Sequence, residues 1–199
     1  MIPNVREQKA IIRALIRDRL RLLSPSERAV ASSQVCCRLQ QEAVWRGAQT
    51  VLLFSPLADE PDIRPALRDA LSAGKTVALP RFEEKEGLYV ACRVTDLIRD
   101  LHPGHFGVAE PISDCPVIPL NRLDFVTAPG VAFAPDGSRI GRGKGYYDRL
   151  LASIRGLKCG IAFDQQLVES IPAEPHDIQL DCILTPTHWR RVDWRAVLK

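Results

Sequence analysis

The most constraining feature of the chain is a glycine-rich segment, RIGRGKGYYDRLL, at residues 139–151. Gly141, Gly143 and Gly145 alternate with two cations, and two tyrosines and an aspartate follow directly. Glycine lets the backbone turn sharply and approach a ligand closely, because it has no Cβ. Successive backbone N–H groups in such a loop can face one concavity, which binds anions. Together with the helix that YYDRLL is expected to begin, the segment predicts a phosphate site.

A glycine-rich loop that carries cations can equally be a flexible, solvated turn, and the pattern alone does not separate the two. The two familiar phosphate fingerprints are absent. GxGxxG requires two residues before its last glycine, and GxxxxGK[ST] requires a glycine at Ser138 and a hydroxyl at Gly145. A lysine, two tyrosines and an aspartate nevertheless crowd into residues 144–148, which favours a binding site over a bare linker.

Length and composition narrow the class of protein. With 199 residues, 46% of them hydrophobic, the chain can bury a sizeable core, and residues 1–199 are expected to form one domain. The net charge of +3 is too small to indicate nucleic-acid binding by itself. The six cysteines form no CxxC pair, the chain opens with a charged segment, and no apolar run approaches the roughly 20 residues of a membrane helix. We therefore expect a cytoplasmic protein with reduced thiols.

The first predicted helix covers residues 4–23, with Asn4 in position to cap it. Lys9 and Arg13 stand four residues apart, so one face of this helix presents both cations. A run of cations on a helix is usually a solvated face, and the alternative is a clasp for a polyanion. Ser24-Pro25 should end this helix, and a second helix is expected to run to about Trp45.

The middle of the chain alternates strand and helix signals. TVLLFS at residues 50–55 predicts a buried strand, followed by a helix and a second strand, KTVALP. Strand, helix and strand with short connections form a right-handed parallel crossover. Four more strands are expected, the last of them at residues 181–186. The predicted fold is therefore α/β, an open, mostly parallel, Rossmann-like sheet with helices on both faces.

Acidic side chains at three places suit a magnesium site. Glu60 lies in the loop after the first strand, Asp148 follows the glycines, and Asp177 lies in a proline-bounded loop before the last strand. Magnesium prefers oxygen ligands and usually bridges one or two carboxylates to the phosphates of a substrate. Helix capping and surface turns are the other interpretations of these acids. Spacing alone thus predicts an α/β protein that binds a phosphorylated ligand.

The chain resembles the 5-formyltetrahydrofolate cyclo-ligase family, also called methenyltetrahydrofolate synthetases. The resemblance spans nearly the whole chain, and its most specific part is the GRGKGYYD block with its flanks. It also departs from the usual family pattern, with Ala134 where an acid is common and Phe106 where some members have tryptophan. The segments that carry the resemblance are KxxxR at 9–13, FSPLADEPD at 54–62, FGVAEP at 106–111, and residues 123–151 and 160–186.

The resemblance implies an ATP- and Mg²⁺-dependent conversion of 5-formyltetrahydrofolate to 5,10-methenyltetrahydrofolate, with release of ADP and phosphate. The formyl oxygen is a poor leaving group until it is phosphorylated, so cations must hold the triphosphate and neutralise the transferring group. Lys144, Arg142 and Tyr146 are implied as catalytic residues. ATP binding is implied for Lys9, Arg13, Arg139, Gly141, Arg142, Gly143, Lys144, Gly145, Tyr146 and Tyr147. Folate binding is implied for Phe54, Ser55, Glu60, Phe106 and Tyr146, and metal binding for Asp148 and Asp177.

Two other classes of protein share parts of this pattern. A phosphosugar isomerase would use the α/β fold and the glycine loop without needing Lys9 or Arg13. A non-enzymatic RNA- or ribosome-associated module would use the basic first helix as its contact surface. The cyclo-ligase resemblance instead implies folate and ATP as the partners, with no nucleic acid and no membrane, and a monomer or weak dimer.

Overall fold

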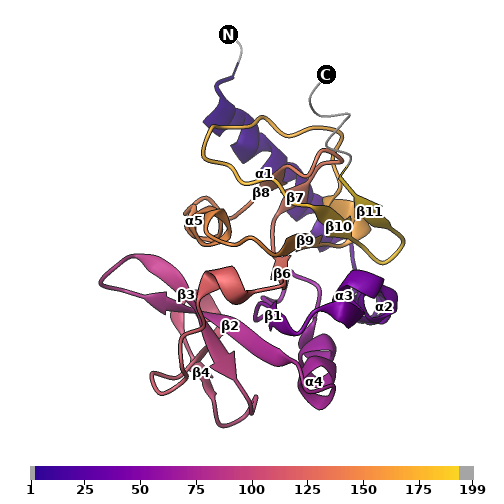
Figure 1. Ribbon diagram of the computed structural model, residues 1–199. Coiled ribbons are helices and arrows are strands. Elements are labelled where there is room, and N and C mark those ends of the chain that lie inside the picture. The colour runs from indigo at the N-terminus through magenta and orange to yellow at the C-terminus, as the bar shows by residue number, and fades with distance from the viewer. Residues whose placement is uncertain (1–2, 193–199) are drawn as a thin grey trace.

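The computed structural model describes residues 3–192, and its centre is a seven-stranded sheet in the order β11-β10-β9-β6-β1-β2-β3 (Figure 1). The five inner strands run parallel, and the two edge strands β3 and β11 are antiparallel to their neighbours. The predicted mostly parallel α/β sheet is confirmed. The strands are β1 (Thr50–Leu52), β2 (Thr76–Glu83), β3 (Leu88–Val94), β6 (Phe125–Ala128), β9 (Leu157–Ile161), β10 (Cys182–Leu184) and β11 (Trp189–Arg191).

Both N-terminal helices begin at capping boxes that the sequence supplies. The Asn4 side chain accepts a hydrogen bond from the Glu7 N–H at the start of α1 (Val5–Arg21). The Ser24 side chain accepts one from the Glu27 N–H at the start of α2 (Pro25–Gln41). Such caps each contribute about 1 kcal/mol to helix stability. The prediction that the second helix continues to Trp45 is wrong, because Glu42 has an extended ψ of 129° and separates α2 from the short α3 (Ala43–Gly47).

Helices cover both faces of the sheet, as predicted. Side chains alternate along β1, so Val51 contributes to the core beneath α2, α3 and α4 (Arg64–Ser72), whereas Leu52 contributes to the core beneath α5 (Tyr146–Ala152). In Figure 1, α5 lies on one side of the sheet, and α2, α3 and α4 lie on the opposite side. Each fully buried aliphatic side chain contributes about 1.5–3 kcal/mol, so both layers stabilise the strands that carry the site.

The carboxyl ends of the parallel strands meet at one edge of the sheet. The chain leaves β6 there, forms the β7 (Ala132–Phe133) and β8 (Arg139–Ile140) hairpin, and continues through the glycines into α5. Helix α1 packs against this hairpin through Ile16 and Leu20. Loops that follow parallel strands commonly bind ligands at this edge.

Peripheral elements complete the described part of the chain. A second hairpin pairs β4 (Leu101–Pro103) with β5 (Ala109–Pro111). The short 3₁₀ turns are η1 (His105–Gly107), η2 (Leu120–Arg122) and η3 (Asp164–Gln166). The sequence reading ended the sheet at residues 181–186, but β11 follows and pairs with β10. Within residues 3–192, no helix combines the length and the apolar character needed to cross a membrane.

Candidate functional site

A cavity of about 520 Å³, here called the central cavity, opens at the carboxyl edge of the sheet. The glycine loop forms one wall, and the loop between β1 and α4 forms another. Strand β3 contributes a third wall through Tyr89. The predicted site residues that line this cavity are Ser55, Glu60, Arg139, Gly141, Arg142, Lys144, Gly145, Tyr146, Tyr147 and Asp148. The fold therefore brings together residues that are up to 93 positions apart, from Ser55 to Asp148.

The glycine loop has the backbone conformation that its sequence anticipates. Gly143 and Gly145 have φ values of 97° and 67°, which lie in the left-handed region where side-chain-bearing residues are strained. Lys144 stands between them, is exposed and lines the central cavity. Its ammonium group makes no hydrogen bond or ion pair with any residue of the described chain. The loop thus presents an unneutralised cation to the cavity.

Arg142 connects the glycine loop to the acidic loop across the cavity. Its Nη2 donates to Asp59 Oδ1 at 2.6 Å and to Glu60 Oε1 at 3.0 Å. Glu60 is only 8% exposed, and its other oxygen accepts from the Leu57 N–H at 3.0 Å. Burial raises the pKa of Glu60, while the Leu57 N–H and Arg142 oppose that rise. Glu60 is therefore a buried carboxylate whose countercharge belongs to the predicted phosphate loop.

Arg139 is 5% exposed and links the glycine loop to α5. Its Nη2 donates to Asp148 Oδ1 at 2.7 Å, and its Nη1 donates to the Pro129 carbonyl at 3.1 Å. Its Nε is buried and has no hydrogen-bond partner among the described residues, which is unusual for a charged group. The ion pair fixes the Asp148 carboxylate beside the central cavity.

Helix α1 contacts the carboxyl edge of the sheet through Lys9 and Arg13, the two cations that lie four residues apart on one face of the helix. Arg13 Nε donates to the Gly141 carbonyl at 2.9 Å. Lys9 Nζ donates to Glu174 Oε2 at 2.7 Å and to Asp177 Oδ2 at 2.6 Å, with a Lys9 side chain that is 7% exposed. Burial alone would lower the pKa of Lys9, but the two carboxylates outweigh it and raise that pKa. Both cations are therefore held at the site.

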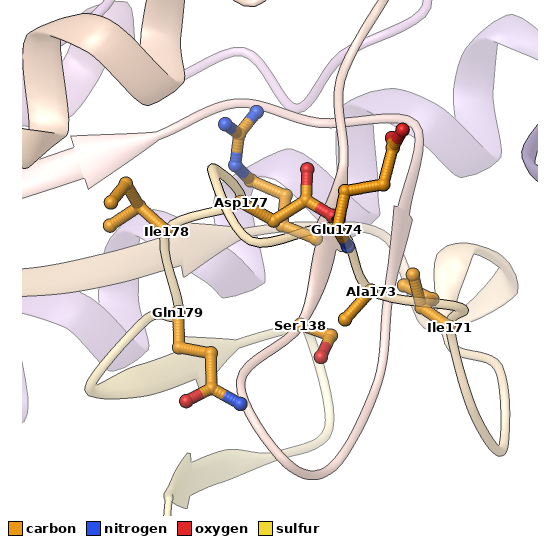
Figure 2. A pocket seen from close by; sticks show the side chains of 8 residues that line it. Ser138, Ile171, Ala173, Glu174, Asp177, Ile178 and Gln179 are labelled. Carbon is orange, nitrogen blue, oxygen red and sulfur yellow. The ribbon is translucent and has the colours of Figure 1, made fainter. Parts of the chain in front are cut away.

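Asp177 and Glu174 also line a second cavity of about 420 Å³, here called the side cavity. Figure 2 shows both acids near one end of it, beside the loop that carries Ile171. Burial by itself would raise the pKa of Asp177. The hydrogen bonds from Lys9 and from the Glu174 N–H, together with the charge of Lys9, outweigh burial and lower that pKa. Oxygen or nitrogen atoms of Glu174, His176 and Asp177 lie within 4.8 Å of one another, which is a spacing that can hold a metal ion.

Arg139 joins the two cavities because it lines both of them. Of the two predicted metal-binding acids, Asp148 lines the central cavity and Asp177 lines the side cavity. Arg139 lines both cavities and so lies between the two acids' sites. Sequence reasoning missed Glu174, although it lies only three residues before Asp177 in the same proline-bounded loop. Its N–H donates to Asp177 Oδ2 at 2.7 Å, a local turn that this spacing permits.

Of the two phenylalanines that the resemblance implied as folate-binding, the structure places one, Phe54, away from both cavities. Phe54 is 1% exposed and packs in the hydrophobic core, because the strand end that carries it is covered by helices, and it lines neither cavity. The surroundings of the Phe106 side chain lie outside what the structure describes. Tyr89, Tyr146 and Tyr147 form the aromatic wall instead, with the Tyr89 ring centroid 5.9 Å from that of Tyr146 and 5.7 Å from that of Tyr147. Burial and the Glu110 charge raise the pKa of Tyr89 to about 12.

The fold and the site define an α/β protein with a cationic glycine loop at the carboxyl edge of a parallel sheet. Comparison with known proteins identifies the family. Residues 5–186 match the 5-formyltetrahydrofolate cyclo-ligase family, and the chain belongs to this family of enzymes. Membership establishes a ligase of folate metabolism as the class of protein.

Individual relatives are similar in sequence to this chain over most of their lengths. The chain is 34% identical to the 5-formyltetrahydrofolate cyclo-ligase of Escherichia coli K12, over 87% of this chain and 97% of that protein. It is 27% identical to the Mus musculus cyclo-ligase, over 91% and 95% of the two chains. The solution structure of Aquifex aeolicus 5,10-methenyltetrahydrofolate synthetase superimposes with a TM-score of 0.83 at 34% identity, covering 92% of each chain.

Proposed function

We propose that the chain, acting as one domain, converts 5-formyltetrahydrofolate to 5,10-methenyltetrahydrofolate with ATP and Mg²⁺. The formyl oxygen attacks the γ-phosphorus of ATP and ADP leaves. The neighbouring amine nitrogen then attacks the formyl carbon, loses its proton, and phosphate departs with the former formyl oxygen. The single observation that carries the proposal, beyond family membership, is Lys144. It lines the central cavity from a loop built of glycines and has no hydrogen-bond or ion-pair partner among the described residues.

The central cavity has the composition expected for a folate. Its volume of about 520 Å³ suits a bicyclic ring with part of its extension, since ligand pockets span roughly 300–1,000 Å³. Glu60 supplies a buried acceptor for ring N–H groups, and Ser55 lines the same cavity from the same loop. Tyr89, Tyr146 and Tyr147 supply the apolar walls that an aromatic ring system requires.

The phosphates are proposed to lie on the glycine loop between the two cavities. Lys144 and Arg142 would contact the transferring group, where fixed cations stabilise the developing charge without reorganisation. Arg142 must leave Asp59 and Glu60 to do so, and that exchange would release Glu60 for the folate. Lys9, Arg13, Arg139, the loop glycines and the two tyrosines complete the proposed ATP contacts.

The acids at this edge fit the magnesium that the family implies. Asp148 and Asp177 offer carboxylate oxygens, the ligand type that magnesium prefers, and each already pairs with a cation, Asp148 with Arg139 and Asp177 with Lys9. When bound, Mg²⁺ would neutralise phosphate oxygens beside these acids. Lys9 and Arg139 hold the two carboxylates in place, and Glu174 extends the oxygen donors on the Asp177 side.

Calorimetric titration separates this function from its rivals. The chain is expected to bind ATP and 5-formyltetrahydrofolate, whereas a phosphosugar isomerase would bind ribose phosphate and an RNA-associated module would bind single-stranded RNA. Lys144→Ala should lower turnover efficiency about ten- to hundredfold with the fold intact, because a hydrogen bond to a charged group contributes about 1.5–3 kcal/mol. Lys85→Ala, an exposed lysine outside both cavities, is the matched control. An unchanged rate in Lys144→Ala would remove the assignment of the loop.

A further inference from the structure

Glu60 has little hydrogen-bonding capacity left for a ligand while it pairs with Arg142. Its Oε1 accepts from Arg142 Nη2 at 3.0 Å and from Arg142 Nε at 3.4 Å, and its Oε2 accepts from the Leu57 N–H at 3.0 Å. An ionised carboxylate oxygen offers about two acceptor sites, so Arg142 occupies both sites on Oε1. The Glu60 side chain is only 6% exposed, which leaves few other directions of approach. A ligand N–H that binds Oε1 must therefore displace the Arg142 guanidinium.

Arg142 is subject to the same competition from the other side. Its Nη2 is shared between Glu60 and Asp59, with Asp59 Oδ1 at 2.6 Å. The guanidinium that pairs with these two acids is the group that a phosphate on the glycine loop requires. Arg142, Asp59 and Glu60 are here called the latch. In its closed form, which the structure shows, the latch occupies the partners of both a folate ring and a phosphoryl group.

Opening the latch for one ligand lowers the cost of binding the other. A phosphate that takes Arg142 leaves Glu60 as a buried carboxylate without its cation, which is unfavourable unless a ligand N–H replaces the guanidinium. A folate ring that takes Glu60 leaves Arg142, whose side chain is 45% exposed, without that partner. The ligand that binds first must break the ion pairs, and the second ligand does not. Such coupling is reciprocal, so each ligand raises the affinity for the other by the same factor.

Arg17 is placed to receive Asp59 when Arg142 leaves. Arg17 and Asp59 line one pocket of about 160 Å³, together with Arg13 and Arg142. Arg13 donates to the Gly141 carbonyl, whereas Arg17 is exposed and makes no hydrogen bond or ion pair with any described residue. Arg17 belongs to α1, which packs against the β7–β8 hairpin. A packed helix therefore presents a cation that can stabilise the open latch.

We propose that the latch makes the binding of the two substrates cooperative, with Asp59 and Arg17 as its positioning residues. Asp59 holds Arg142 on Glu60 in the closed latch, and Arg17 takes Asp59 in the open latch. The inference rests on the proposed function and adds a coupling between its two substrates. As a consequence, Arg142 reaches the triphosphate mainly when folate occupies Glu60, and the triphosphate alone is held weakly.

Calorimetric titration of the full chain measures this coupling directly. The ligands are 5-formyltetrahydrofolate and the magnesium complex of the β,γ-imido analogue of ATP, which does not transfer its terminal phosphoryl group. Each ligand is titrated alone and then in the presence of a saturating concentration of the other. The parent chain is expected to bind each ligand about 5- to 150-fold more tightly when the other is present, with equal factors for the two.

Two variants should shift the latch in opposite directions. Asp59→Asn weakens the closed latch, so each ligand alone should bind about two- to fivefold more tightly, the contribution of a partly exposed ion pair. Arg17→Met weakens the open latch, so each ligand alone should bind about two- to fivefold more weakly. When the other ligand is saturating, both variants should match the parent, because the latch is then open. Asp114→Asn and Arg21→Met, both exposed and outside the latch, are the matched controls.

The outcomes separate this inference from the proposed function. A parent chain to which one or both ligands do not bind would overturn the proposed function together with the latch. A parent chain that binds both ligands, each unaffected by the other, would overturn the latch alone. Asp59→Asn that tightens the imido analogue equally with and without folate would also overturn it, because the residue would then act only through its charge near the phosphates. Arg17→Met that weakens the analogue equally in both conditions would make Arg17 a phosphate contact and remove it from the latch.

Discussion

Replacing Lys9 by methionine tests the ion-pair cluster that joins α1 to the 171–179 loop. The change keeps helix propensity and most of the apolar stem, since methionine is a good helix former. It removes hydrogen bonds of 2.7 and 2.6 Å to Glu174 and Asp177. Breaking a fully buried pair costs about 3–5 kcal/mol, but these acid side chains are 36% and 20% exposed, so water offsets part of the loss. We expect a loss of about 2–3 kcal/mol in the free energy of unfolding.

The pH dependence of this loss follows from the two pKa shifts. The lowered pKa of Asp177 means that its contribution is present above about pH 3.9 and is lost as pH falls through the folded-state value. The raised pKa of Lys9 means that its contribution is present below about pH 10.4 and is lost as pH rises through its folded-state value. The difference between parent and Lys9→Met should thus be constant from about pH 5 to 9 and shrink in acid.

Urea denaturation at several pH values measures this difference. In thermal unfolding, the same change should appear as a loss of about 4–12 °C for a chain of this length. Arg21→Met removes an exposed ion pair to Asp18 on the same helix and should cost less than about 1 kcal/mol. Millimolar Mg²⁺ should restore part of the stability of Lys9→Met, since both carboxylates lose their ammonium partner. Equal stability of the two variants, with no effect of pH, would refute the cluster as a stabilising contact.

Further expected outcomes concern the metal and the folate. Asp148→Asn should raise the Mg²⁺ concentration for half-maximal rate about tenfold. It should also lower the melting temperature, because it removes the charge that pairs with the buried Arg139. Asp114→Asn, exposed and outside both cavities, should leave both unchanged. A lower melting temperature with an unchanged Mg²⁺ requirement would instead make Asp148 only a structural partner of Arg139 and of its helix N-terminus. Glu60→Gln should raise the KM for folate about tenfold or more. In the parent, that KM should rise as pH falls through the raised pKa of Glu60, which exceeds the ordinary value of about 4.3, and the variant should lack this dependence.

Local signals in the sequence account for much of the fold. The caps at Asn4 and Ser24 make hydrogen bonds only within their own helices, so they can be predicted without knowing the tertiary structure. The glycine loop is equally local, because positive φ at Gly143 and Gly145 requires that residue type wherever the loop lies. The continuous apolar run of residues 51–54 is typical of a strand that is buried on both faces, and the two helical layers bury it in this way.

Features that depend on contacts between residues far apart in the sequence were not predicted. Strand β11 is short and partly polar, and it exists because β10 offers an open edge. Glu174 became a site residue only when its loop met Lys9, which is 165 positions away. Tyr89 reads as one more strand residue until β3 is placed beside α5. The resemblance implied Phe54 as a folate contact, yet Phe54 is 1% exposed and packs in the hydrophobic core. Such positions require the three-dimensional arrangement.

The most direct test of the proposed function is a spectroscopic assay of the product. The chain, ATP, Mg²⁺ and 5-formyltetrahydrofolate are mixed, and the absorbance of the 5,10-methenyl chromophore is followed against equimolar release of ADP and phosphate. We expect the absorbance to grow when all three substances are present and to stay constant when ATP or Mg²⁺ is omitted. We expect it to grow far more slowly with Lys144→Ala but not with Lys85→Ala. Folded parent chain that produces no methenyl absorbance while all three are present would contradict the proposed function.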